Sequence, residues 1–210
     1  MQKIPTVFLR DENDMRRLTH TVHPACQWVI DGEGTATRKY DGTCAMLDER
    51  GHWWMRREVK PGKPIPEKFV EVNHDKATGK LMGWVPSDPQ GYGHPMIDAL
   101  DITGVAKDLA LSGAPGAFKD VMREASKDLA PGTYELIGPK INGNPENCER
   151  HQLIPHKQAL VLENDLYKPP YSFEALQHFV LWAVTDLGFE GVVWHHKDGR
   201  MAKLKGRDYK

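Results

Sequence analysis

Lys39 occupies a position in this 210-residue sequence where a lysine amine could act as a nucleophile. It lies between a short β-type run, Thr35–Arg38, and an Asp41-Gly42 turn. Such a turn fixes the backbone, so the lysine is held in place rather than moving freely in solvent. The deprotonated amine of a held lysine can form covalent intermediates. The four residues Lys39 to Gly42 also fit an ordinary hairpin turn with a lysine on the surface.

Three later segments place charged side chains on β-type runs. Glu135 is flanked by apolar residues that alternate with it, and Glu190 opens the run Glu190–Val193. Lys203 and Lys205 share one face of a strand, because side chains alternate with period two. A strand that faces a core rarely places two lysines on one side. Taken alone, each glutamate could be an acidic residue on an edge strand, and the two lysines could form a basic face exposed to solvent.

Taken in order, these segments resemble the motifs of the covalent nucleotidyltransferases, the superfamily of DNA ligases, RNA ligases and mRNA-capping guanylyltransferases. Lys39-Tyr40-Asp41-Gly42 looks like motif I, and Glu135 through Gly138 looks like motif III. Glu190–Val193 resembles motif IV, and Lys203-Leu204-Lys205 resembles motif V. The matches follow the order of the family and cover most of the chain.

The resemblance implies that Lys39 attacks the α-phosphorus of ATP and becomes a lysyl–AMP. A free lysine has a pKa of about 10.4, so nearby cations and partial burial must lower it. Lys203, Lys205 and a bound divalent metal would supply that cationic field. Lys203 and Lys205 are suited to hold the α-phosphate, and Glu190 is suited to place Mg²⁺ or Mn²⁺.

Further nucleotide-binding roles follow from position in the family. Glu135 is expected to contact the nucleoside ribose or to lie near the metal. Asp41 and Gly42 belong to the nucleotide-binding motif, and the glycine permits close approach of the backbone to the sugar. What orients the departing pyrophosphate is left open.

An arginine shortly after motif I usually contacts the ribose in this family. Arg56 and Arg57 both qualify, alternation allows only one to face the cleft, and we expect Arg57 to be that one. His156 is the local choice for the side chain that stacks on adenine, although it also fits a loop histidine. Asn142–Pro145 reads as a plain turn whose amides could also bind a ribose or phosphate.

The cysteines do not predict a disulfide framework. Cys26, Cys44 and Cys148 are odd in number and scattered, which is typical of reduced thiols in an intracellular protein. Cys148-x-x-His151 with His156 lacks four ligands at regular spacing, so no zinc site is expected there. The N-terminal residues lack the apolar run of a signal peptide, and we expect a cytoplasmic protein.

Composition narrows the class of protein. Hydrophobic residues make up 40% and charged residues 27%, which is typical of a soluble globular protein. The 28 basic and 29 acidic residues nearly cancel. This balance excludes a generally basic nucleic-acid coat but allows a basic groove.

Short β-type runs separated by turn signals alternate with two helical segments. One helix is expected between Pro115-Gly116 and Pro131, and another begins after Ser172. The expected strands are Gln27–Asp31, Thr35–Arg38, Thr43–Asp48, His52–Arg57, Thr133–Gly138, Gln158–Glu163, Gly191–His195 and Arg200–Lys205. We therefore predict an α+β fold, a nucleotidyltransferase domain of mainly antiparallel sheets with flanking helices, in a single domain over residues 1–210.

Only five residues follow Lys205, so we expect no OB-fold domain of the kind that DNA ligases and capping enzymes carry. The Lys39–Cys44 run and the Trp53–Arg56 strand look like a group of minimal, single-domain 5′-to-3′ RNA ligases. We expect an ATP-dependent RNA ligase that joins 5′-phosphate and 3′-hydroxyl RNA ends, with no membrane or obligate protein partner. Two alternatives stay open: a capping-type guanylyltransferase or other nucleotidyl carrier, and an inactive RNA-binding module of the same fold.

Overall fold

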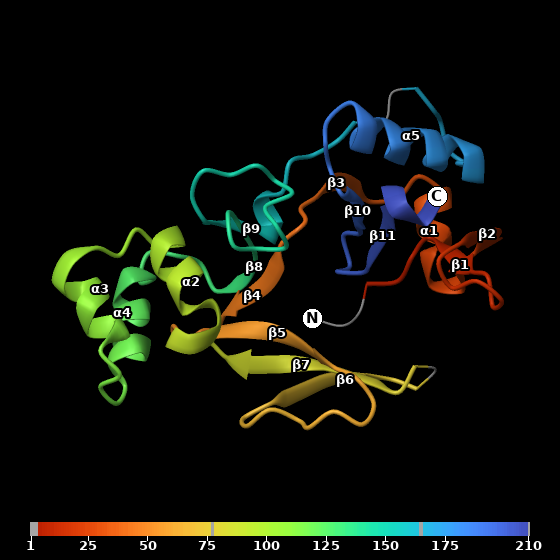
Figure 1. Cartoon of the computed structure of the whole chain (residues 1–210). Helices are drawn as coiled ribbons and strands as arrows, with labels where there is room; N and C mark the ends of the chain where they lie inside the picture. The colour runs from red at the N-terminus through yellow and green to blue at the C-terminus, as the bar shows by residue number, and fades with distance from the viewer. Residues whose placement is uncertain (1–3, 77, 164–165, 210) are drawn as a thin grey trace. The chain divides into compact units, whose positions relative to one another are not determined.

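The computed structural model describes residues 4–76, 78–163 and 166–209. Its contacts divide the chain into two compact units (Figure 1). The first, the inserted unit, is Asp41–Gln158, and the second, the split unit, joins Ile4–Tyr40 to Ala159–Lys210. The single-domain organisation stays a prediction.

The split unit is built on a three-stranded antiparallel sheet in the order β11-β10-β3. A separate two-stranded sheet pairs β1 with β2. The strands are β1 Phe8–Arg10, β2 Leu18–Val22, β3 Thr35–Lys39, β10 Gly191–His195 and β11 Met201–Lys205. The helices are α1 Gln27–Ile30 and α5 Phe173–Thr185, with 3₁₀ turns η1 Pro24–Cys26 and η4 Gly206–Tyr209.

One face of this sheet is covered by the split unit's core. Val192, Trp194 and Leu204 are buried and pack in one cluster with the apolar residues of α5. Helix α5 begins as expected, because Ser172 Oγ accepts a hydrogen bond from the Ala175 backbone N–H at 3.1 Å. The opposite face of the sheet is therefore left for polar side chains.

The inserted unit carries a six-stranded antiparallel sheet in the order β6-β7-β5-β4-β8-β9. Its strands are β4 Thr43–Leu47, β5 Trp53–Val59, β6 Val70–Asp75, β7 Lys80–Pro86, β8 Gly132–Ile137 and β9 Gln152–Pro155. Its helical segments are η2 Pro89–Gly93, α2 His94–Ala99, α3 Gly104–Leu111, α4 Ala117–Ala125 and η3 His156–Gln158. Apolar side chains of β4, β5 and β8 pack with those of α2 and α4, so the helices cover one face.

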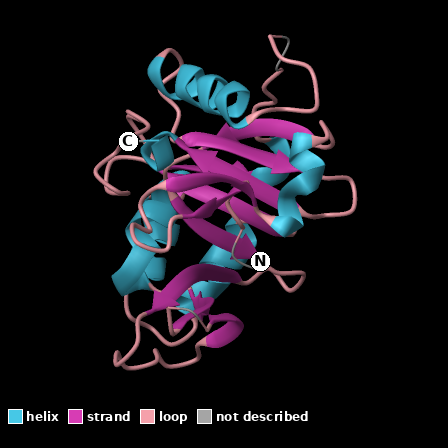
Figure 2. Ribbon diagram, turned by 90° about the vertical axis from the view of Figure 1, so that its right-hand side faces the viewer, coloured by secondary structure: helices cyan, strands magenta, loops and turns pink. Residues whose placement is uncertain are grey.

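The mixed α+β class is confirmed, as is the antiparallel pairing of the sheets with helices beside them (Figure 2). The strand predicted over Gln27–Asp31 is wrong: those residues form helix α1. The strand predicted over Gln158–Glu163 is reduced to an isolated antiparallel bridge between Val161 and Thr37, and the named strand before it is β9, at Gln152–Pro155. Periodicity does not separate short apolar helices from strands. Within the described residues, no helix is long and apolar enough to cross a membrane.

Candidate active site

The split unit aligns two of the predicted site lysines across its sheet. Gly191 of β10 pairs with Lys39 of β3 on one side and with Lys205 of β11 on the other. Side chains of directly paired residues project from the same face, so both lysines extend from the face opposite the core. Gly191 has no side chain to separate them, and a Cβ there would lie 2.2 Å from the Leu204 carbonyl oxygen.

Glu190 lies between these two lysines. Lys39 Nζ donates a hydrogen bond to Glu190 Oε2 at 2.6 Å, and Lys205 Nζ donates to Glu190 Oε1. Both oxygens of one carboxylate are therefore bonded to ammonium groups. The side chains of Lys39 and Glu190 are only 17% and 13% exposed, so they interact where water screens charge poorly.

Burial and neighbouring charges together lower the pKa values of both Glu190 and Lys205. Burial raises the pKa of Glu190, but the charge of Lys39 and hydrogen bonds from Lys205 and Lys39 outweigh it and hold that pKa below its ordinary value. The pKa of Lys205 is lowered, first by burial and then by the charge of Lys39, against the opposing effect of Glu190. Glu190 therefore stays ionised at neutral pH.

Lys203 lies one pairing step further along β11. It pairs with Val193 of β10, on the same face as Lys205, while Ala202 and Leu204 point into the core. Its backbone also bonds to the N-terminal segment, with its N–H donating to the Pro5 carbonyl at 3.0 Å. Both lysines expected to hold phosphate thus extend from the face that carries Lys39.

Arg38 stacks on two rings that adjoin Lys39 and Glu190 in the chain. Its guanidinium carbon lies 4.4 Å from the centre of the Tyr40 ring and 4.2 Å from the centre of the Phe189 ring. Tyr40 follows Lys39 in the chain, and Phe189 precedes Glu190. This stacking, of a kind worth about 0.5–2 kcal/mol for each ring, stabilises both segments.

The Asp41-Gly42 turn lies in the inserted unit, where a loop after β8 holds it. Asn142 Nδ2 donates to Asp41 Oδ1 at 3.0 Å and to the Gly42 carbonyl oxygen at 2.9 Å. Glu146 Oε1 accepts a hydrogen bond from the Asp41 backbone N–H at 2.7 Å. Asn142, in the segment expected to be a plain turn, therefore positions the turn that follows Lys39.

Gly42 is required by its contact with β8. A Cβ at this position would lie 2.4 Å from the Leu136 carbonyl oxygen and 2.8 Å from Glu135 Cγ. The glycine was expected to allow close approach of a sugar. In this structure the backbone that approaches it closely is that of β8, and the sugar contact stays a prediction.

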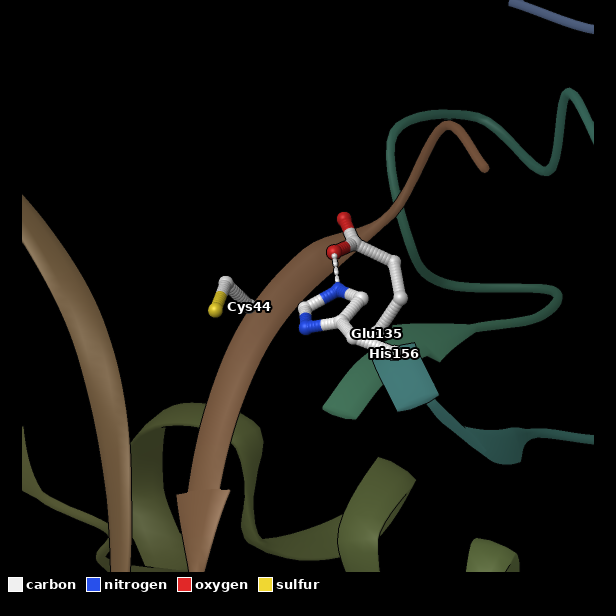
Figure 3. A group of neighbouring side chains, drawn as sticks. All are labelled: Cys44, Glu135 and His156. Carbon is white, nitrogen blue, oxygen red and sulfur yellow. Dashed lines mark hydrogen bonds and ion pairs between the residues drawn. The ribbon is translucent and has the colours of Figure 1, made fainter. Parts of the chain in front are cut away.

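Glu135 and His156, both expected to bind nucleotide, lie together in the inserted unit (Figure 3). His156 Nε2 and Glu135 Oε2 are 2.9 Å apart, and His156 Nδ1 and Thr133 Oγ1 are also 2.9 Å apart. Cys44 is the direct cross-strand partner of Glu135. The polar edge of the imidazole is therefore held in place, and its role against adenine stays a prediction.

The register of β5 separates the two candidate arginines. Met46 of β4 pairs with Trp54, so alternation puts Arg56 on the sheet face of Cys44 and Arg57 on the face of Met55. Both arginines line a cleft of about 450 Å³ within the inserted unit. Arg56 therefore shares the sheet face of Glu135, whereas the ribose contact expected of Arg57 stays a prediction.

Three residues that hold the site were missed by sequence reasoning: Arg38, Cys44 and Glu146. The two rings that flank Arg38 are separated widely in sequence, and its role depends on the pairing of β3 with β10. Cys44 acquires its neighbours only through the register of β4 on β8. The Asn-rich turn after β8 was the one local signal available for the loop that contains Glu146.

The family model and the similar proteins found by comparison carry the same description. The family model described as RNA ligase 1 matches residues 75–209. RNA ligase 1 of Danio rerio is 27% identical over 97% of this chain and 79% of its own length. RNA ligase 1 of Pongo abelii is 23% identical and that of Rattus norvegicus 24% identical, each over 80% of this chain and 65% of its own length. Because the family model covers more than half of the chain, this protein belongs to the RNA ligase 1 family.

Proposed function

We propose that this protein is an ATP-dependent RNA ligase that carries AMP on Lys39 and joins RNA 5′-phosphate and 3′-hydroxyl ends. Membership of the RNA ligase 1 family supports the reaction class. The observation that carries the mechanism is the placement of Lys39, which is mostly buried and hydrogen-bonded to Glu190 beside Lys205. On this proposal, the α+β arrangement is that of a nucleotidyltransferase domain.

In the first step, the deprotonated Lys39 amine attacks the α-phosphorus of ATP. The Nζ–P bond forms as the bond from the α-phosphorus to the bridging oxygen breaks, and pyrophosphate leaves. The ionised Glu190 orients Lys39 Nζ, and its lowered pKa makes it a weak acceptor for the proton that the amine loses. Lys205 and Lys203 offer cationic groups to the α-phosphate on the same face.

In the later steps, the RNA 5′-phosphate attacks the phosphorus of lysyl–AMP and the Nζ–P bond breaks. AMP is then attached to the RNA end through a phosphoanhydride. Attack by the RNA 3′-hydroxyl forms the phosphodiester and releases AMP. Lys39 is regenerated as an amine, so a single lysine serves each cycle.

The carboxylates fit the hard divalent cation expected of such a reaction. Glu190 and Glu135 are each of the ligand type that Mg²⁺ or Mn²⁺ prefers, and a cation bound at either carboxylate would neutralise phosphate charge. Glu190 already bonds Lys39 and Lys205 with its two oxygens. A cation at Glu190 is therefore expected to require that at least one lysine move away from the carboxylate.

Intact-mass measurement tests the covalent step directly. Purified protein incubated with ATP and Mg²⁺ should gain the mass of one AMP, and incubation with GTP should give no adduct. Lys39→Arg keeps a cation for Glu190 but removes the nucleophile, so it should fold and gain nothing. Lys197→Arg, at an exposed turn position of the same unit, is the matched control and should label normally.

The joining reaction needs its own measurement. Labelled protein free of ATP should pass its AMP to a 5′-phosphorylated RNA and then yield a joined product. Absence of an adduct with either metal would contradict the lysyl–AMP mechanism. An adduct that forms only with GTP would support a capping-type enzyme instead, and an adduct that never transfers to RNA would refute the ligase.

A further inference from the structure

The sheet of the inserted unit brings a thiol, a carboxylate and an imidazole to one place. Cys44 and Glu135 face each other across β4 and β8, and His156 follows β9. Taking one ligand atom from each residue, the three atoms lie within 4.8 Å of one another (Figure 3). Among the described residues, this is the one group of three such donors found so close together.

We propose that Cys44, Glu135 and His156 form a binding site for a zinc-type divalent cation, with a fourth coordination position open to water or substrate. Sulfur, nitrogen and oxygen together are the ligand set of zinc sites, and three protein ligands with one open position are typical of catalytic ones. A thiolate and an imidazole disfavour Mg²⁺, which prefers oxygen ligands alone. On this proposal Glu135 serves the zinc-type cation, and the Mg²⁺ or Mn²⁺ of the proposed ligase reaction is left to Glu190.

The three ligand atoms, which lie within 4.8 Å of one another, could share one ion after side-chain movements of about an ångström. Zinc binds sulfur at about 2.3 Å and nitrogen or oxygen at about 2.0–2.2 Å, so two N or O ligands in a tetrahedron lie about 3.3 Å apart. Glu135 Oε2 and His156 Nε2 are 2.9 Å apart and need to separate by a few tenths of an ångström. Cys44 is only 8% exposed, so its thiolate would be shielded from bulk water.

Thr133 completes the arrangement behind the imidazole. Its Oγ1 lies 2.9 Å from His156 Nδ1, on the side of the ring away from Glu135. When the Nδ1–H donates to this hydroxyl, the Nε2 lone pair points at Glu135 and is available to a metal. A hydrogen bond of this kind fixes the tautomer and orientation of metal-binding histidines. The side chain that would orient His156 is therefore already in place.

The test uses metal binding alone, so its outcome is independent of the proposed ligase activity. The metal-free 210-residue protein is titrated with Co²⁺, and the thiolate-to-cobalt charge-transfer band is recorded. Zn²⁺ should then displace Co²⁺ with a stoichiometry of one. Cys44→Ser should abolish the charge-transfer band, and Thr133→Val should weaken Zn²⁺ binding by about 10-fold or more.

Matched controls separate this site from others in the chain. Cys148→Ser changes another cysteine of the same unit, and His94→Gln changes an exposed histidine at the start of α2. Both should bind Co²⁺ and Zn²⁺ as the unmodified protein does. If Cys44→Ser fails to fold, His156→Gln serves instead and should weaken Zn²⁺ binding while His94→Gln does not. A spectrum without the thiolate band, or its loss in Cys148→Ser, would refute the proposal.

Discussion

Lys39 Nζ lies 2.6 Å from Glu190 Oε2, although the two residues are separated by 151 positions in the chain. The pairing of β3 with β10 brings them together, because Lys39 is the register partner of Gly191, the residue after Glu190. A lysine so held loses rotamer freedom before any substrate arrives. Removing this hydrogen bond should therefore test both the stability of the split unit and the positioning of Lys39.

Glu190→Gln removes the carboxylate charge that Lys39 and Lys205 share. Leaving two mostly buried ammonium groups without their counterion should lower the free energy of unfolding by about 2–3 kcal/mol, toward the lower end for buried pairs because all three side chains keep some exposure. The rate of adenylylation should fall by at least as much as the loss of folded protein alone would cause. Urea unfolding and intact-mass labelling measure the two effects. Glu12→Gln, an exposed glutamate of the same unit, should change neither.

The pH dependence of stability should report the lowered pKa of Glu190. Its ordinary value is 4.5 and its folded value is lower, so it contributes stability above pH 4.5 that is lost as pH falls through the folded pKa. The stability difference between the unmodified protein and Glu190→Gln should therefore shrink on acidification. Urea unfolding of both proteins over this range tests it. If the difference in unfolding free energy stayed constant with pH, the lowered pKa of Glu190 would be contradicted.

Lys205→Ala and Lys203→Ala should each lower adenylylation much more than Lys197→Ala. The first two extend from the face that carries Lys39, whereas Lys197 is exposed in the turn between β10 and β11. Rates of AMP incorporation at limiting ATP give the comparison. Equal losses at all three positions would mean that this face does not hold the phosphate.

Gly42→Ala should destabilise the inserted unit by about 1–3 kcal/mol, because the new Cβ would overlap the Leu136 carbonyl oxygen at 2.4 Å. Gly91→Ala is the matched control, since its Cβ would have only an ordinary contact, 3.5 Å from Asp88 Oδ1. Thermal unfolding of both variants measures the effect. Similar melting temperatures for the two would show that the turn relaxes without cost.

Asn142→Gly should slow adenylylation by loosening the turn after Lys39. It removes the two hydrogen bonds to Asp41 and Gly42 while tolerating the positive φ of 49° at this position. Asn147→Gly is the control, because Asn147 is also exposed with a positive φ, of 52°. Single-turnover labelling should separate the two variants, and a slowdown shared by both would indicate only a more flexible loop.

Much of this site was predictable because its motifs are local. The strands around Lys39, Glu190 and Lys205 follow from alternation and turn residues, and the structure confirms β3, β10 and β11 within a residue or two. Helix α1 was missed because a four-residue apolar helix has the same apolar content as a buried strand. The sequence also placed no strand at β9, whose few apolar residues lack an alternating pattern.

The contacts that depend on register were not predictable. Whether Arg56 or Arg57 shares a face with Glu135 is decided by the pairing of β4 with β5 and β8. A shift of one residue would exchange their faces, and no short-range signal fixes that choice. The neighbours of Cys44 depend on the same pairing. Because Cys44, Glu135 and His156 come from separate segments, they form no spacing pattern in the sequence that could predict a metal site.

The split unit also has a consequence for synthesis on the ribosome. Among the named strands of the described chain, β3 hydrogen-bonds only to β10, which begins at Gly191. Residues 41–158 form a continuous unit and can begin to collapse around their own core while the C-terminal segment is still being made. We therefore expect Lys39 to be synthesised early, whereas its strand β3 gains its bridge to Val161 and then its pairing with β10 only late in translation.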